Sequence, residues 1–289
     1  MAIPGLTTDR ARLASDLAAL GVGAGQVVLV HSALSRLGHV EGGPAAVVAA
    51  LRELLGHDGT LAVPSGTSAN SDTSPHYLRA TAGMSLTELA RYRSAMPAYD
   101  PRSTPTTAMG RIPEYVRTLP GALRSAHPHT SFAAIGPRAA AITGGHARDC
   151  LLGERSPLAR LYDAGALVLL LGVGYDKCSA FHLAEYRYTG DPPRRSYRGV
   201  IDDGRGRGWY EFVDVNVDAS DFEALGADFD RTGAVRRGWA GAAQARFFPL
   251  AAAVDYAVGW FTTHRRPATG PTRPADGPTR RTGRVHSRT

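Results

Sequence analysis

The residues best suited to chemistry lie in one short stretch, GVGYDKCSAFHLAEYR, which spans positions 172–187. His182 and Glu185 are three residues apart, so they share one face of a helix, and Asp176 lies in the loop before that helix. A histidine beside a carboxylate can remove a proton from an amine near neutral pH. On spacing alone, however, such a pair on a helix is more often a simple surface hydrogen bond than a catalytic pair.

Other catalytic motifs are missing from the sequence. The glycines of GVG at 172–174 resemble the start of a dinucleotide-binding turn, but the third glycine of that motif would fall at Lys177. There is no Gly-x-x-x-x-Gly-Lys-Ser/Thr phosphate loop and no Gly-x-Ser-x-Gly elbow. His-Glu-x-x-His and Cys-x-x-Cys are also absent, and His127 and His129 are not expected to hold a metal. Acid–base chemistry at His182 therefore remains the main candidate.

Alternating helical and strand patterns must position this stretch, and they predict an α/β fold. The first elements are a helix capped by Thr8 that ends at Leu20, a buried strand at 26–31, a helix from Pro44 to 55, and a strand at 60–63. A strongly apolar strand at 166–171 leads into the candidate stretch, followed by a helix at 181–188. Because open α/β sheets bind ligands at the carboxyl ends of their strands, the candidate side chains should face a ligand site.

The remaining segments are less regular. From 65 to 105 the periodicity fades, apart from a short helix near 86–92, and long irregular segments of this kind are commonly functional. Further predicted elements are a helix at 112–117, a strand at 132–135, a hairpin that pairs 197–201 with 209–213, and a last helix at 249–264.

The charge of the chain is concentrated at one end. Of the net charge of +7 over 289 residues, +6 falls from Arg265 onward, where seven arginines stand against one aspartate. The nearly neutral remainder fits an enzyme for small molecules better than a nucleic-acid-binding domain. We expect one domain over 1–265, a disordered basic tail over 266–289, and no nucleic-acid partner.

The sequence also bears on location. Its longest wholly apolar run, 164–174, has 11 residues, whereas a membrane span needs about 20. The first ten residues lack a secretory signal, and the two cysteines, Cys150 and Cys178, are expected to be reduced. We therefore expect a cytoplasmic protein without a membrane partner, either a monomer or a homodimer.

Six ordered blocks of the chain carry a family resemblance. They are VLVHSALSRLG (28–38), DGTLAVPSGT (58–67), DPRSTPTTAMGRIPE (100–114), SAHPHTSFAAIGP (125–137), LGERSPLARLY (152–162) and LLLGVGYDKCSAFHLAEYR (169–187). With these blocks the chain resembles the aminoglycoside 3-N-acetyltransferases, the antibiotic acetyltransferase family, over roughly residues 6–265. The resemblance implies a central mixed sheet flanked by helices, distinct in fold from the GCN5-related acetyltransferases.

The resemblance also implies an activity. This is direct transfer of an acetyl group from acetyl-CoA to the 3-amino group of the deoxystreptamine ring of aminoglycoside antibiotics, without a metal, which confers resistance. His182 occupies the position of the catalytic general base. Glu185 occupies that of the accompanying carboxylate, which either orients the imidazole or holds a substrate ammonium.

Further site residues follow from the same resemblance. The loop that contains His31, Ser32 and Ser35 is implied to contact coenzyme A, and a turn is implied to support the same site, namely Ser156, Pro157 and Leu158. From the residues alone, His31 could instead be a histidine satisfied by backbone groups at a strand end.

The proposed substrate makes its own demand on the pocket. Aminoglycosides carry several ammonium groups, so the acceptor site should present carboxylates. The candidates are Asp72, Asp176 and Glu185, with Asp149 and Glu154 in reserve. Two alternatives remain open, an N-acetyltransferase that acts on a different amine, such as a biosynthetic intermediate, and a non-catalytic protein that sequesters aminoglycosides.

Overall fold

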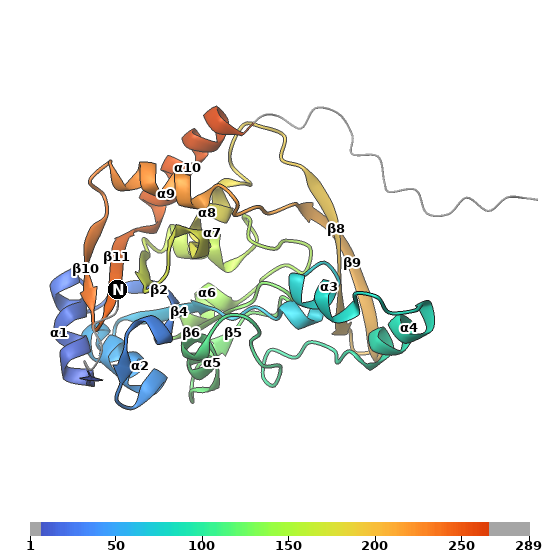
Figure 1. The fold of residues 1–289 in the computed structure, drawn as a ribbon, viewed down its shortest axis with the longest axis horizontal. Helices are drawn as coiled ribbons and strands as arrows, with labels where there is room; N and C mark the ends of the chain where they lie inside the picture. The colour runs from blue at the N-terminus through green and yellow to red at the C-terminus, as the bar shows by residue number, and fades with distance from the viewer. Residues whose placement is uncertain (1–6, 266–289) are drawn as a thin grey trace, which may run out of the picture.

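The chain is described over residues 7–265 by a computed structural model, whose centre is a seven-stranded sheet (Figure 1). Across the sheet the strands are β10 (Arg236–Ala240), β11 (Ala243–Pro249), β7 (Leu167–Leu171), β2 (Val27–Ser32), β4 (Thr60–Pro64), β6 (Phe132–Ile135) and β5 (Leu123–Arg124). Strands β7, β2 and β4 are parallel, and every other neighbouring pair in this sheet is antiparallel. The expected mixed sheet is confirmed, whereas the predicted tail at 266–289 lies outside the described residues.

Helices cover both faces of the sheet, which explains why the central residues of its parallel strands are apolar on both faces. Along β2, Val28 and Val30 belong to one buried cluster, and Val27 and Leu29 belong to the other. The first cluster lies under α1 (Arg10–Leu20), α2 (Gly43–Leu55) and α5 (Arg111–Thr118). The second lies under α6 (Ala139–Thr143), α7 (Pro157–Asp163), α8 (Ala180–Ala184), α9 (Phe222–Asp230) and α10 (Leu250–His264). The fold therefore has three layers, helix on sheet on helix.

The first helix begins differently from the prediction. Asp9 caps it by accepting a hydrogen bond at Oδ1 from the backbone N–H of Arg12 at 2.8 Å. Thr8, the predicted cap, instead belongs to the two-residue strand β1 (Thr7–Thr8), which pairs with β3 (His39–Val40). Helical periodicity could not reveal this, because the competing strand pairs with a segment far along the chain.

Most other predicted elements are confirmed to within one residue at either end, and the strand at 132–135 is confirmed without change. The helix predicted at 181–188 is shorter, because the chain after Ala184 tightens. The backbone N–H groups of Glu185, Tyr186 and Arg187 each bond to the carbonyl three residues back, as in a 3₁₀ turn, and the regular α-helix ends. Strands β10 and β11 have no counterpart among the predicted elements.

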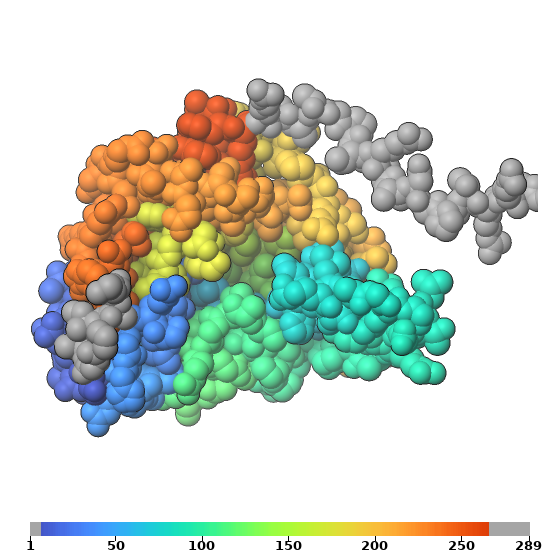
Figure 2. Space-filling view, viewed as in Figure 1, coloured from blue at the N-terminus to red at the C-terminus, as the bar shows by residue number. Residues whose placement is uncertain are grey.

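A long hairpin and two helices form an arm beside the sheet, which projects to the right in Figures 1 and 2. We define the arm as residues 68–100 and 194–215. It contains the short turn η2 (Ser68–Asn70), helices α3 (Pro75–Thr81) and α4 (Leu86–Ala95), and strands β8 (Arg194–Asp202) and β9 (Arg207–Val215). The hairpin pairs Tyr197 with Phe212, so the predicted pairing is confirmed. Helix α3 was not predicted.

The two segments of the arm are joined by a small core of their own and by one buried amide. Tyr77, Met96 and Val200 form the core. Asn70 accepts a hydrogen bond at Oδ1 from the backbone N–H of Val200 at 2.7 Å, and its Nδ2 donates to the carbonyls of Val200 and Pro97, both at 3.1 Å. The amide thus bonds both backbone groups of Val200, whose carbonyl also accepts from the backbone N–H of Tyr99 at 2.9 Å.

Candidate active site

A cavity of about 810 Å³ opens at the carboxyl ends of the three parallel strands. Its walls come from residues within 31–43, at and after the end of β2, from Pro64 at the end of β4, from residues within 108–113, and from residues within 173–182 after β7. Figure 2 shows a hollow where the blue, green and yellow surfaces of these segments meet. The chain therefore has a cavity where the sequence predicted a ligand site.

His182 and Glu185 form a hydrogen-bonded pair beside this cavity, with 2.6 Å between Nδ1 and Oε2. An ionised carboxylate can only accept, so Nδ1 carries the proton and Nε2 is the nitrogen that can accept another. The His182 side chain lines the cavity and is 16% exposed, whereas that of Glu185 is 1% exposed. The Phe222 ring packs against the imidazole, 4.7 Å between centroids. The alternative of a surface hydrogen bond does not fit this burial.

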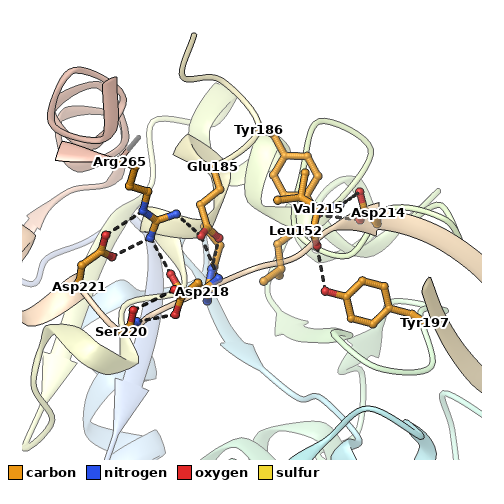
Figure 3. A network of polar contacts seen from close by, with 11 residues as sticks. Leu152, Glu185, Tyr186, Tyr197, Asp214, Val215, Asp218, Ser220, Asp221 and Arg265 are labelled. Atoms are coloured by element: carbon orange, nitrogen blue, oxygen red, sulfur yellow. Dashed lines mark hydrogen bonds and ion pairs between the residues drawn. The ribbon is translucent and has the colours of Figure 1, made fainter. Parts of the chain in front are cut away.

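The second oxygen of Glu185 is held by other parts of the chain (Figure 3). Oε1 accepts from the backbone N–H of Asp218 at 2.9 Å and from Nη1 of Arg265 at 2.5 Å. Arg265 also donates to both carboxylate oxygens of Asp221, at 2.8 and 2.7 Å, and to the Asp218 carbonyl at 2.7 Å. Both oxygens of Glu185 therefore have protein partners. This geometry supports its orienting role and gives no support to direct contact with a substrate ammonium.

Hydrogen bonds keep the groups of this cluster in their charged forms. Burial disfavours the charged form of Arg265, but its hydrogen bonds to Asp221 and Glu185 outweigh burial and raise its pKa. Burial would raise the pKa of the Asp218 carboxyl, but the hydrogen bonds donated by Ser220 outweigh this effect, and the pKa is lowered. The cluster is therefore a set of fixed charges around the His182–Glu185 pair. Its supporting members were not predicted, because Asp218 and Arg265 lie 33 and 80 residues from Glu185 in sequence.

His31, Ser32 and Ser35 all line the cavity, as the prediction of a coenzyme contact requires. His31 and Ser32 end β2, and Ser35 lies in the turn η1 (Leu34–Arg36). Burial, reinforced by the neighbouring His182, lowers the pKa of His31 to about 3, so this imidazole is neutral at physiological pH. Within the described chain, His31 Nε2 and Ser32 Oγ have no hydrogen-bond partner. His31 is thus not fully satisfied by backbone groups.

Of the predicted acceptor carboxylates, Asp176 lines the cavity. Its side chain is 42% exposed and lies 2.7 Å from Nζ of Lys177. The two reserve carboxylates, Asp149 and Glu154, are partly exposed, pair with arginines and do not line the cavity. Asp176 is therefore the candidate that a cationic ligand could reach from this cavity.

Two other predicted groups lie away from the cavity lining. Asp72 belongs to the arm, where its carboxylate pairs with Arg198 at 2.9 Å. The turn Ser156–Leu158 is buried at the start of α7, and the Ser156 hydroxyl accepts from the backbone N–H of Leu158 at 3.2 Å. Leu158 shares a core cluster with α8, so the structure gives this turn a packing role behind the site.

Residues 7–265 contain no cluster of three or more histidine, cysteine or acidic side chains arranged to hold a metal ion. His127 and His129 are instead buried, and His127 stacks on His146 with 4.7 Å between centroids. Burial lowers the pKa of His129 and of His146 to about 4. These histidines therefore pack as neutral rings at physiological pH.

Comparison with known proteins identifies the family. The sequence model described as Aminoglycoside 3-N-acetyltransferase matches residues 29–262, which include the strand with His31, the cavity loops and the His182–Glu185 pair. Aminoglycoside N(3)-acetyltransferase VII of Streptomyces paromomycinus is 38% identical over 280 residues, which cover 91% of this chain and 94% of the relative. The chain belongs to the aminoglycoside 3-N-acetyltransferase family. As a family member it is an acyltransferase, which confirms the resemblance found in the sequence.

Solved structures extend this family likeness to the fold. The crystal structure of YokD from Bacillus subtilis has a TM-score of 0.84 and 35% identity, covering 89% of this chain and 94% of that one. AAC-IIIb, solved as a binary complex with CoASH, has a TM-score of 0.79 and 30% identity, covering 92% and 100%. In the part of the chain that the structure describes, no helix is both long and apolar enough for a transmembrane span.

Proposed function

We propose that this family member transfers the acetyl group of acetyl-CoA to the 3-amino group of the deoxystreptamine ring of aminoglycosides, with His182 as the general base. One observation carries the proposal. The His182 imidazole lines the cavity at the strand ends, and its Nδ1 is held by the buried carboxylate of Glu185. Family membership supports the reaction class and the class of acceptor. Acetylation of this amine would confer resistance to the antibiotic.

The geometry explains how the pair would work. An aliphatic amine is mostly protonated at neutral pH, and only its neutral form, left after one proton has passed to solvent, can attack a thioester. His182 donates at Nδ1 to Glu185, so Nε2 accepts the amine proton as the C–N bond forms and the C–S bond breaks. Glu185 stabilises the resulting imidazolium, and His182 then returns the proton to the departing thiolate. No covalent acyl-enzyme is needed.

The cavity wall also fits a coenzyme. The cavity volume of about 810 Å³ is within the range of small-molecule binding sites. His31, Ser32 and Ser35 place polar groups along one wall, and the AAC-IIIb structure with CoASH is a family precedent. We therefore assign these three residues to coenzyme binding and the turn Ser156–Leu158 to support from the core.

The proposed reaction also requires that the cavity recognise the cationic acceptor. Asp176 meets this requirement, because its carboxylate lines the cavity and is exposed enough to exchange Lys177 for a substrate ammonium. Asp72 is engaged by Arg198 in the arm, so we assign it to the packing of the arm.

The test is a thiol-release assay with the pure protein, acetyl-CoA and a panel of aminoglycosides. We expect release with at least one aminoglycoside, and mass spectrometry should locate the acetyl group on the 3-amino nitrogen. His182→Ala should lower kcat by about 10²- to 10⁴-fold while the aminoglycoside still binds by calorimetry. His57→Ala is the matched control, because that histidine is 92% exposed and pairs only with Asp58.

Each alternative has its own outcome. Turnover with an unrelated amine and none with aminoglycosides would identify a different acceptor. Binding of aminoglycosides without turnover in the parent protein would identify a sequestering protein. Full turnover by His182→Ala would remove His182 as the base even if the substrate is correct.

A further inference from the structure

We propose that Arg265 is a positioning residue for the base: it fixes the Glu185 carboxylate that orients His182, and its charge limits how tightly the imidazole holds a proton. The inference rests on the proposed function, because it adds a residue to the same proton-transfer site. It does not require Arg265 to touch either substrate.

Arg265 reaches Glu185 from a distant element. It directly follows α10, and its guanidinium carbon lies 3.8 Å from the centroid of the Phe261 ring. In this position the side chain is 17% exposed and divides its donors among Glu185, both oxygens of Asp221, and the Asp218 carbonyl. A planar fork with five donors can hold these acceptors at once, whereas a lysine ammonium cannot reproduce that geometry.

Figure 3 shows Arg265 between Asp221 and Glu185. The bidentate pair with Asp221 immobilises the guanidinium, and the remaining Nη1 donor then fixes one oxygen of Glu185. Fixing that oxygen also fixes the direction of Oε2, which holds His182 at 2.6 Å. Without Arg265, Oε1 would keep only the Asp218 N–H, and the carboxylate could rotate about its last torsion.

The contact between Arg265 and Glu185 could not be expected from the position of Arg265 in the sequence. The family model matches residues 29–262, so Arg265 lies three residues beyond the matched segment. In the sequence it belongs with the arginines of the basic end. In the structure its guanidinium lies in the cluster beside Glu185 and is 17% exposed.

Arg265 also affects proton transfer through its charge. The titratable and charged groups around the imidazole come from several elements and are Glu185, His31, Asp218, Asp221, Arg265 and the ion pair Asp176–Lys177. A nearby cation disfavours the imidazolium. Removal of Arg265 therefore favours a protonated His182, and the base should stay inactive up to a higher pH.

The experiment compares full-length variants by pH profiles of kcat/KM with acetyl-CoA and an accepted aminoglycoside. Arg265→Gln should lower kcat/KM at pH 7 by about 10- to 100-fold, the scale expected for a misplaced catalytic group. The acid limb of the profile should move up by about 0.5 to 1 pH unit. Arg265→Lys, which keeps the charge but not the fork, should lose rate without moving the limb. Arg231→Gln is the control, because that arginine is 72% exposed and pairs with Asp228 outside the site.

Asp221→Asn separates positioning from general stability. It loosens Arg265 but leaves the cation beside Glu185, so the rate should fall while the acid limb stays or moves to lower pH. Equal rate losses in Arg265→Gln and Asp221→Asn, with no change in either pH profile, would mean a structural role only. A parent-like profile for Arg265→Gln overturns the proposal. If His182→Ala is inactive in the same assay, that result leaves the proposed function standing.

Discussion

Replacing Glu185 with glutamine tests the role of the carboxylate with almost no change in shape. The glutamine oxygen must face the two donors that now bind Oε1, the Asp218 N–H at 2.9 Å and Arg265 at 2.5 Å. Its NH₂ group then faces His182 Nδ1 and donates to it. The imidazole proton moves to Nε2, which is the nitrogen that has to accept a proton from the amine.

We therefore expect Glu185→Gln to lower kcat/KM by about 10²- to 10⁴-fold, which corresponds to about 3–5 kcal/mol of transition-state stabilisation. The free energy of unfolding should fall by about 1–3 kcal/mol, because the ion pair with Arg265 becomes a hydrogen bond from its charged guanidinium to a neutral amide oxygen. Thiol release measures the rate, and ¹⁵N NMR of labelled histidine reports which nitrogen carries the proton. Glu154→Gln, at an exposed ion pair, is the control. A rate within threefold of the parent, or a large loss with Nδ1 still protonated, would refute the tautomer argument.

Three further predictions concern the acceptor, the core and pH. Asp176→Asn should raise KM for the aminoglycoside about tenfold with little change in kcat, because its hydrogen bond to an ammonium loses its charge; steady-state kinetics at saturating acetyl-CoA measure this. Gly226→Ala should lower the melting temperature by at least about 5 °C, because the new Cβ would lie 2.0 Å from the Tyr175 ring. The free energy of unfolding should fall by about 2–4 kcal/mol from pH 7 to pH 5. The reason is that burial lowers the pKa of His129 and His146 to about 4, below that of a histidine in the unfolded chain. Their contribution to the free energy of unfolding is therefore fully present above about pH 6.5 and is lost as the pH falls. Urea titrations at the two pH values measure this loss.

Each of these has a matched comparison. Asp149→Asn lies outside the cavity lining and should leave KM unchanged, so an equal rise in both variants would contradict the role of Asp176. Gly259→Ala, at an exposed helical position with no heavy atom within 4 Å of the new Cβ, should keep or raise the melting temperature. An unfolding midpoint that is the same at pH 7 and pH 5 would contradict the neutral-histidine argument.

The sequence predicts the inner part of the fold well, because its strands are continuous apolar runs. β7 and β6 are confirmed to within one residue, since both are buried on both faces. β10 reads RRGWA and is mostly exposed, so no apolar pattern marks it. Its position depends on pairing with β11, and a single sequence carries no signal for such a pairing.

The candidate site likewise contains contacts that the sequence predicts and contacts that it does not. The contact between His182 and Glu185 could be predicted, because the two residues lie on one turn of chain. Asp72 has the local character of a solvated loop carboxylate, and its pairing with Arg198 joins residues 126 positions apart. Arg265 shows the same limit of prediction from sequence, since its contact with Glu185 depends on where α10 ends in space. The cytoplasmic location and the oligomeric state stay predictions.

The arm has a consequence for protein engineering. Asn70 in segment 68–100 hydrogen-bonds both backbone groups of Val200 in segment 194–215. The two segments of the arm therefore form one structural unit. A chimaera that takes 68–100 alone from a relative with an apolar residue at position 70 would leave the buried Val200 N–H without this acceptor. Exchange of the arm between relatives therefore requires that 68–100 and 194–215 be transferred together, whereas His182 and Glu185 lie outside both segments.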